Sequence, residues 1–157
     1  MTNPAMNVDD LYQEIILDHY KAPHGAGLRD PHEAEVHHVN PTCGDEITLR
    51  VHLEGSTVAD VSYNAAGCSI SQASTSVMHE LVVGKSVEDA FEVLEQFQTL
   101  MQGKGQVEPD EDVLEDGIAF AGVAQFPARI KCALLGWMAF KDAVSRSGSA
   151  PDSQEEA

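Results

Sequence analysis

The period of the apolar residues changes once along the chain, and this change constrains the fold more than any other feature. Over residues 47–53 apolar and polar residues alternate, which is the period of a half-buried β-strand. After Gly67 the apolar residues recur at the spacing of α-helices. The segments with helical spacing are 69–83, 87–101 and about 127–144. Strands that precede helices predict an α+β fold, a small antiparallel sheet with helices packed on one face.

Weaker signals complete the expected elements. A helix is expected over about 11–20, followed by a loop that is rich in Pro and Gly. Two further strands are expected at about 35–40 and 58–63, although Asp60 interrupts the alternation of the second one. The length of 157 residues favours a single domain, which we assign to residues 1–144, and a domain of this length can bury a core without disulfide bonds.

The charge of the chain excludes several functions. Asp and Glu number 26 against 9 Lys and Arg, which gives a net charge of −17 with neutral His. Nucleic acids and anionic membranes are recognised by cationic surfaces, so neither is an expected partner. A basic protein partner remains compatible with this charge.

Two segments of the chain are especially acidic. Gly103–Ala124 holds six carboxylates and one Lys, and a short helix is expected at about 112–120. Its carboxylates either offer negative charge to a basic partner or are simply solvated. Residues 145–157 are polar and acidic, which predicts a disordered tail.

The chain shows no sign of export. Residues 1–10 lack a basic region followed by an apolar run, and no stretch approaches 18 apolar residues. The three cysteines are an odd number and so give no complete disulfide framework. We therefore expect a cytoplasmic protein with reduced thiols.

The cysteines carry the candidate chemistry. Cys43, Cys68 and Cys132 are separated by 25 and 64 residues, so no Cys-x-x-Cys motif is present. Spacing alone is equally compatible with three buried cysteines that only pack in the core. Their local sequence favours a functional site instead. Cys43 lies in a loop between Pro41 and Gly44, and Cys68 lies where the strand region gives way to a helix.

The third cysteine can be placed on a helical wheel. If Ile130 is at 0°, Trp137 and Leu134 fall within about 40° of it, whereas Cys132 falls near 200° and Arg129 near 260°. This predicts that Cys132 points away from the core, beside Arg129. Three thiolates and one oxygen or nitrogen ligand suit tetrahedral Zn²⁺.

The fourth ligand has two kinds of candidate. Asp45 lies two residues after Cys43 across a glycine, so both side chains can reach a common point, although a carboxylate here also fits a turn before a strand. The seven histidines are alternative ligands. None is adjacent to a cysteine, and we interpret most of them as surface residues.

The motifs around these residues resemble a known family. The chain resembles the IscU-like, or NifU N-terminal-like, iron–sulfur cluster assembly proteins over about Leu11 to Val144. Four motifs carry the resemblance, in the order in which the family has them. They are Tyr12-x-x-x-Ile16-Leu17-Asp18-His19-Tyr20, Asn40-Pro41-x-Cys43-Gly44-Asp45, Gly67-Cys68-x-Ile70-Ser71 and Pro127-x-Arg129-x-x-Cys132. The resemblance implies an α+β fold with helices on one face of the sheet.

Two departures point to one branch of the family. Scaffold-type members usually have a His before the third cysteine, where this chain has Lys131. The Cys68–Cys132 interval is also longer by about twenty residues, which makes the acidic segment at about 103–124 an insertion. Both features are similar to the SufU branch, whose members are zinc-containing sulfurtransferases that work with a SufS-type cysteine desulfurase.

This resemblance implies a role for each site residue. The protein would accept persulfide sulfur and pass it to a downstream Suf cluster-assembly scaffold. Cys43, Asp45, Cys68 and Cys132 would bind Zn²⁺. Cys43 would be the sulfur acceptor, freed when a residue of the partner takes its place on the metal. Arg129 would stabilise the released thiolate or dock the partner, unless it is simply a charged residue on a helix surface.

Two other functions stay open at this point. The same ligands can hold iron in a [2Fe–2S] cluster, which would make the protein a scaffold for cluster assembly. Alternatively the protein is a non-catalytic binding module with a structural zinc. Acceptance of sulfur from a desulfurase would distinguish a sulfurtransferase from a binding module with a structural zinc.

Overall fold

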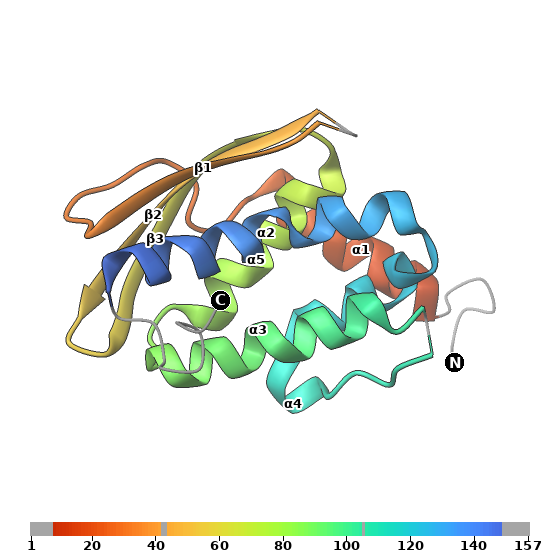
Figure 1. Ribbon diagram of the computed structural model, residues 1–157. Helices are drawn as coiled ribbons and strands as arrows, with labels where there is room; N and C mark the ends of the chain where they lie inside the picture. Colours follow the sequence, from red (N-terminus) through yellow and green to blue (C-terminus); the bar gives the residue numbers. More distant parts are fainter. Residues whose placement is uncertain (1–7, 42–43, 105, 149–157) are drawn as a thin grey trace.

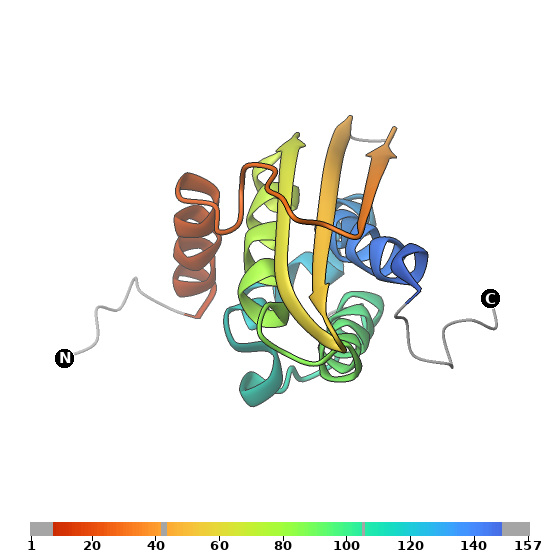
Figure 2. The same ribbon diagram turned by 90° about the vertical axis from the view of Figure 1, so that its left-hand side faces the viewer.

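A three-stranded antiparallel sheet and a layer of helices make up the described part of the chain (Figure 1). The computed structural model describes residues 8–41, 44–104 and 106–148. In chain order the elements are α1 (Val8–Lys21), β1 (Ala34–Asn40), β2 (Asp45–Glu54), β3 (Thr57–Ala66), α2 (Ser69–Val82), α3 (Val87–Gln102), α4 (Glu111–Leu114), the 3₁₀ helix η1 (Glu115–Gln125) and α5 (Pro127–Ser147). Figure 2 shows α2, α3 and α5 on the same side of the sheet, so the predicted α+β fold is confirmed.

The central strand β2 shows why the alternation predicts the sheet. Ile47, Leu49 and Val51 are almost completely buried under the helices, and the intervening residues are exposed or half-buried. The register with β3 shifts between His52 and Leu53, so one extra residue of β3 forms a bulge there. The bulge is the physical reason why Asp60 breaks the alternation of β3.

Helices α2, α3 and α5 begin where the sequence predicts, whereas α1 begins at Val8, three residues earlier than expected. The hydroxyl of Ser86 accepts a hydrogen bond from the Asp89 N–H (3.0 Å) and so caps the N-terminus of α3, as the Ser-x-x-Asp sequence of residues 86–89 predicts. The last helix continues to Ser147, so residues 145–147 are helical and do not belong to a disordered tail. The remainder of the predicted tail, 149–157, lies outside the described residues.

A close contact between α2 and α5 fixes the position of both helices. A Cβ at Gly136 of α5 would collide with the Thr75 side chain of α2. The Ser74 hydroxyl donates to the Ala133 carbonyl (2.6 Å) and accepts from Trp137 Nε1–H (3.0 Å). Small and hydroxyl-bearing residues therefore let the two backbones approach closely without leaving a buried polar group unpaired.

The acidic segment contributes to the core as well as to the surface. Leu114 and Phe120 are buried, and the Phe120 ring packs edge-on against Phe97 with the ring centroids 5.9 Å apart. The single short helix expected at about 112–120 is wrong. Glu115 has a positive φ of 45°, which separates α4 from η1.

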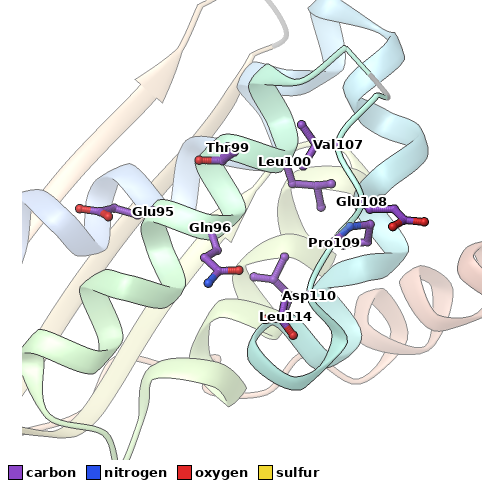
Figure 3. Close-up of a pocket in the computed structure, with 9 residues that line it drawn as sticks. All are labelled: Glu95, Gln96, Thr99, Leu100, Val107, Glu108, Pro109, Asp110 and Leu114. Atoms are coloured by element: carbon purple, nitrogen blue, oxygen red, sulfur yellow. The ribbon is translucent and has the colours of Figure 1, made fainter.

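A shallow groove separates α3 from the chain that leads into α4 (Figure 3). Carboxylates of Glu95, Glu108 and Asp110 are among its lining residues, and the nine residues drawn there include neither Cys nor His. The groove is therefore separate from the candidate sites below. Within residues 8–148, as far as they are described, no helix combines the length and apolar character that crossing a bilayer requires.

Candidate metal centre

Three of the predicted metal ligands meet at one end of the sheet. Asp45 is the first residue of β2, Cys68 directly precedes α2, and Cys132 lies in the second turn of α5. One ligand atom of each residue lies within 4.8 Å of those of the other two. The fold thus brings together residues that are 23 and 64 positions apart, as the sequence predicts.

Asp45 is the buried member of the group that organises its neighbours. Its side chain is fully buried, and its Oδ1 accepts a hydrogen bond from the Cys68 backbone N–H (2.8 Å). The Cys68 thiol lies 3.6 Å from the other carboxylate oxygen, Oδ2. Gly67 has a φ of +144°, and a Cβ at this position would collide with the Asp45 carboxylate. Only glycine at position 67 leaves room for this arrangement.

Cys68 occupies the N-cap position of α2. Its backbone is extended (φ −74°, ψ 166°), and the first backbone N–H groups of α2 lie just beyond it. The positive end of the helix dipole therefore lies beside the ligand atoms of Cys68 and Asp45. The half-buried thiol remains partly accessible from solvent.

The wheel prediction for Cys132 is wrong. Cys132 is fully buried, whereas Ile130 and Leu134, the presumed centre of the core face, are only partly buried. The inward face of α5 is instead centred on small residues such as Ala133 and Gly136, which pack against α2. The wheel centred the core face on Ile130 and Leu134. The buried residues of α5 include the large Trp137 and Phe140 as well as Ala133 and Gly136, so the core face is turned toward Gly136, where α2 and α5 approach each other closely.

The separation of the donor atoms suits zinc. In a tetrahedral site with Zn–S of about 2.3 Å and Zn–O of about 2.0 Å, neighbouring ligand atoms are roughly 3.5–3.8 Å apart. The Cys68 Sγ to Asp45 Oδ2 distance of 3.6 Å already matches this value. Because the ligand atoms of all three residues lie within 4.8 Å of one another, side-chain movements of only about 1 Å would bring every pair to the tetrahedral spacing. Two sulfurs and one oxygen fit Zn²⁺ and also fit iron in a cluster.

Cys43, the fourth predicted ligand and the predicted sulfur acceptor, lies outside the described residues. The described residues on either side of it end β1 and begin β2. Asn40 pairs with Asp45 across the two strands, and the Gly44 N–H donates to the Asn40 carbonyl (2.8 Å). Gly44 has a φ of +73°, which favours glycine at this position. The role of Cys43 stays a prediction.

Arg129 lies beside this centre rather than in it. It is exposed on the first turn of α5, three residues before Cys132. It lines a surface groove together with Ser69 and Ile70, the two residues that follow Cys68, and with Phe126, which is 59% exposed. The arrangement puts a cation and an apolar surface next to the thiolates, and the function of Arg129 stays a prediction.

The sequence reasoning missed a second cluster. His19 is not a surface residue: it is 5% exposed, and its Nε2 lies 2.9 Å from Asp116 Oδ2 and 3.8 Å from Glu80 Oε1. These three side chains form the other group of potential metal ligands among the described residues. The sequence of α1 could have indicated the burial of His19. It lies four residues after the partly buried Ile15 and therefore on the same face of the helix.

The fold and the three converging ligands define an α+β protein with a candidate metal centre at one end of its sheet. Comparison with protein families gives the particular family. The model of the NifU-like N-terminal domain matches residues 11–133, and the chain belongs to this family.

Several relatives are similar over nearly their whole length. The zinc-dependent sulfurtransferase SufU of Bacillus subtilis is 44% identical over 142 residues, which cover 89% of this chain and 93% of that protein. The iron–sulfur cluster assembly scaffold protein IscU of Streptococcus pyogenes is 42% identical over 143 residues, with coverages of 91% and 88%. The two relatives are equally close, so identity alone does not separate the two branches.

A solved structure has the same fold. It is that of a protein from Fervidobacterium islandicum AW-1 that is assigned as a candidate iron–sulfur cluster assembly scaffold for the SUF system. It is 37% identical, gives a TM-score of 0.74, and the match covers 83% of this chain and 94% of that one. The resemblance inferred from the motifs is thereby confirmed.

Proposed function

We propose that this protein acts in iron–sulfur cluster assembly as a zinc-containing sulfurtransferase. It accepts persulfide sulfur from a SufS-type cysteine desulfurase and passes it to a downstream Suf cluster-assembly scaffold. The observation that carries the proposal is the convergence of Asp45, Cys68 and Cys132 within 4.8 Å, since Asp45 follows Cys43 by only two residues in the sequence. The name of the relative from Bacillus subtilis supports the same chemistry.

The transfer is a thiol exchange that balances without an added oxidant or reductant. The desulfurase releases alanine from L-cysteine and keeps the sulfur as a persulfide on its own cysteine. The Cys43 thiolate attacks the terminal sulfur, a new S–S bond forms on Cys43, and the S–S bond of the donor breaks. The cysteine of the desulfurase leaves as a thiolate, so the number of persulfides is unchanged.

The described residues have distinct tasks in this proposal. Bound zinc would keep the coordinating thiols deprotonated. Cys68 and Cys132 hold their positions because they are attached to α2 and α5, and Asp45 is fixed by its hydrogen bond from the Cys68 N–H. Cys43, which lies between Pro41 and Gly44 in the sequence, would be the thiolate that leaves the metal and attacks.

A scaffold for a [2Fe–2S] cluster is the second candidate function. The relative from Streptococcus pyogenes carries that name at nearly the same identity, and the same donor atoms can ligate iron. Lys131 bears on the choice, because scaffold-type members usually have a His there. Lys131 is exposed while the adjacent Cys132 is buried, and an ammonium group cannot serve as a metal ligand.

Metal analysis and mass spectrometry separate these functions. Protein purified without added iron is expected to be colourless and to hold about one zinc per chain. After incubation with a SufS-type desulfurase and L-cysteine, a mass increase of one sulfur is expected on Cys43 and is expected to be absent in Cys43→Ser. Brown protein with stoichiometric iron and sulfide would support the scaffold. Zinc without any persulfide would support a structural zinc module.

Arg129 is tested by the kinetics of the desulfurase reaction. We expect Arg129→Gln to raise the KM for this protein as the sulfur acceptor about tenfold, because a docking charge is lost, with zinc content unchanged. Arg129→Lys is expected to restore much of the loss. Arg146→Gln, an exposed arginine at the other end of α5, is the matched control. Equal KM values for Arg129→Gln and Arg146→Gln would remove Arg129 from the site.

A further inference from the structure

Four potential metal ligands from four parts of the chain meet away from the thiolates. They come from α1, the loop after it, α2 and η1, and they are His19, His24, Glu80 and Asp116. His24 Nδ1 lies 2.9 Å from Glu80 Oε2, and the two imidazole rings are 4.9 Å apart between centroids. We call this group the histidine cluster.

The His19 ring is held in a fixed orientation. Its Nδ1 lies 2.7 Å from the hydroxyl of Ser76, which also accepts a hydrogen bond from the backbone N–H of His24 (2.8 Å). A carboxylate can only accept, so the His19 ring donates Nε2–H to Asp116. A hydroxyl can both donate and accept, so Ser76 can also hold the tautomer with hydrogen on Nδ1, which leaves the Nε2 lone pair free for a metal.

The donor atoms are already spaced for a metal ion. His19 Nε2 lies 2.9 Å from Asp116 Oδ2 and 3.8 Å from Glu80 Oε1. Ligand atoms at about 2.0–2.2 Å from a divalent ion are roughly 3.0–3.5 Å apart, so the cluster brackets the required spacing. Imidazole and carboxylate donors suit Mn²⁺, Fe²⁺ and Zn²⁺.

The charge around the cluster also favours a cation. The surface hollow at this place is lined by three carboxylates and the two histidines. Its lining residues, all within the described chain, include no Lys or Arg. Asp18 provides the third carboxylate, next to His19 in α1. Glu80 and Asp116 keep 39% and 46% of their side-chain surface exposed, so an ion can reach them directly from solvent.

We propose that His19, His24, Glu80 and Asp116 form a second binding site for a divalent cation of the first transition series, with nitrogen and oxygen ligands and distinct from the thiolate centre. The inference does not rest on the sulfur-transfer function. The two sites share only α2, along which Cys68 and Glu80 are about 18 Å apart.

The test is a titration of zinc-loaded protein with Mn²⁺, followed by electron paramagnetic resonance. Mn²⁺ is a hard ion that does not displace zinc from thiolates, so it reports only the nitrogen and oxygen site. We expect one Mn²⁺ per chain and broadening of the ring protons of both His19 and His24 in NMR spectra. The ring protons of His52, which pairs with Glu33 and Glu54, should be unaffected.

Variants then assign the site. Glu80→Gln and His24→Ala each change a solvent-accessible ligand and are expected to weaken Mn²⁺ binding about tenfold or more, with zinc content unchanged. Glu33→Gln is the matched control, because Glu33 also pairs with a histidine, His52, at 3.1 Å. Absence of stoichiometric Mn²⁺ at millimolar concentration, or equal binding by Glu80→Gln and Glu33→Gln, would overturn the proposal and leave a cluster that only joins η1 to α1.

Discussion

Helix α2 connects two donor sets that differ in almost every property. At its start, Cys68 joins Cys132 and Asp45 in a group that offers sulfur and is largely buried. About 18 Å further along, Glu80 joins the histidine cluster, which offers nitrogen and oxygen and is open to solvent. The first set is built at the ends of secondary-structure elements, and the second from positions within helices and an adjoining loop.

The difference shows how burial selects donor chemistry. At the thiolate centre a fully buried carboxylate is tolerated because a backbone N–H and the start of a helix face it. At the histidine cluster the carboxylates stay partly hydrated, and only the His19 ring is buried. We therefore expect metal at the thiolate centre to contribute to folding, and metal at the histidine cluster to bind reversibly to a protein that is already folded.

The largest effect is expected from a variant that disrupts the thiolate centre and leaves the histidine cluster intact. Cys68→Ser removes a soft ligand, so zinc content should fall from about one per chain to a small fraction. If the Kd for zinc rises about a thousandfold at a fixed zinc concentration, the free energy of unfolding falls by about 4 kcal/mol. The Tm then falls by roughly 8–16 °C. Calorimetry with and without EDTA measures this.

Its control is the metal-free state. In EDTA the variant and the parent protein should unfold within about 1 kcal/mol of each other, because only the zinc contribution differs. Mn²⁺ binding to the histidine cluster should persist in folded Cys68→Ser. A Tm difference that is the same in EDTA would mean that Cys68 stabilises the fold without metal.

The second prediction perturbs the geometry but keeps every ligand. Gly67→Ala should destabilise the protein by about 1–3 kcal/mol and weaken zinc binding, because its φ of +144° excludes a side chain and a Cβ would displace Asp45. Gly122→Ala in η1 is the control, since a Cβ there meets open space. Chemical denaturation and a zinc competition assay compare the two. Similar losses in both variants would contradict the role of Gly67.

The third prediction isolates a histidine of α2 that belongs to neither donor set. Burial lowers the pKa of His79, and its bond to the Val61 carbonyl and the nearby Asp60 only partly offset this. The folded protein thus holds His79 neutral where the unfolded chain, with a pKa near 6.5, takes up a proton. Stability is therefore present above about pH 6.5 and is lost as the pH falls below it, by at most about 1.4 kcal/mol per pH unit.

Denaturation curves in EDTA between pH 7.5 and 5 measure this contribution without metal. His79→Gln should flatten the pH dependence relative to His37→Gln, an exposed histidine of β1. An identical pH dependence in both variants would mean that other groups cause the loss.

The smallest expected effect concerns the acidic segment. Neutralising Asp110, Glu111, Asp112 and Glu115, while keeping Asp116 for the histidine cluster, should slow association with the desulfurase a few-fold at low salt. Stopped-flow measurements at several salt concentrations test this, and Mn²⁺ binding should not change. A rate that is unchanged at every salt concentration would leave these carboxylates as a solvated surface only.

The sequence predicts the parts of this molecule that depend on local chemistry. The alternation around Leu49, the start of α2 after Gly67 and the Ser86 cap each follow from the preferences of a few neighbouring residues. The ligands Asp45, Cys68 and Cys132 also emerge, because the motifs around them resemble one family.

Features that depend on contacts between helices could not be predicted. The buried face of α5 is set by the fit of Gly136 against Thr75, and no period within α5 encodes the shape of α2. The burial of His19 likewise depends on where η1 lies, 97 residues away at Asp116. Pairing over such distances requires the tertiary fold, so a helical wheel misassigned Cys132.

Trp137 gives the molecule an optical sensor of its own assembly. It is the chain's single tryptophan, it is fully buried, and it stacks on Phe97 with the ring centroids 4.4 Å apart. It also lies five residues after Cys132 and donates to Ser74 of α2. Its fluorescence therefore reports whether α5 is seated on α2. Release of metal that loosens this pair would appear as a red shift in emission, in unlabelled protein and in real time.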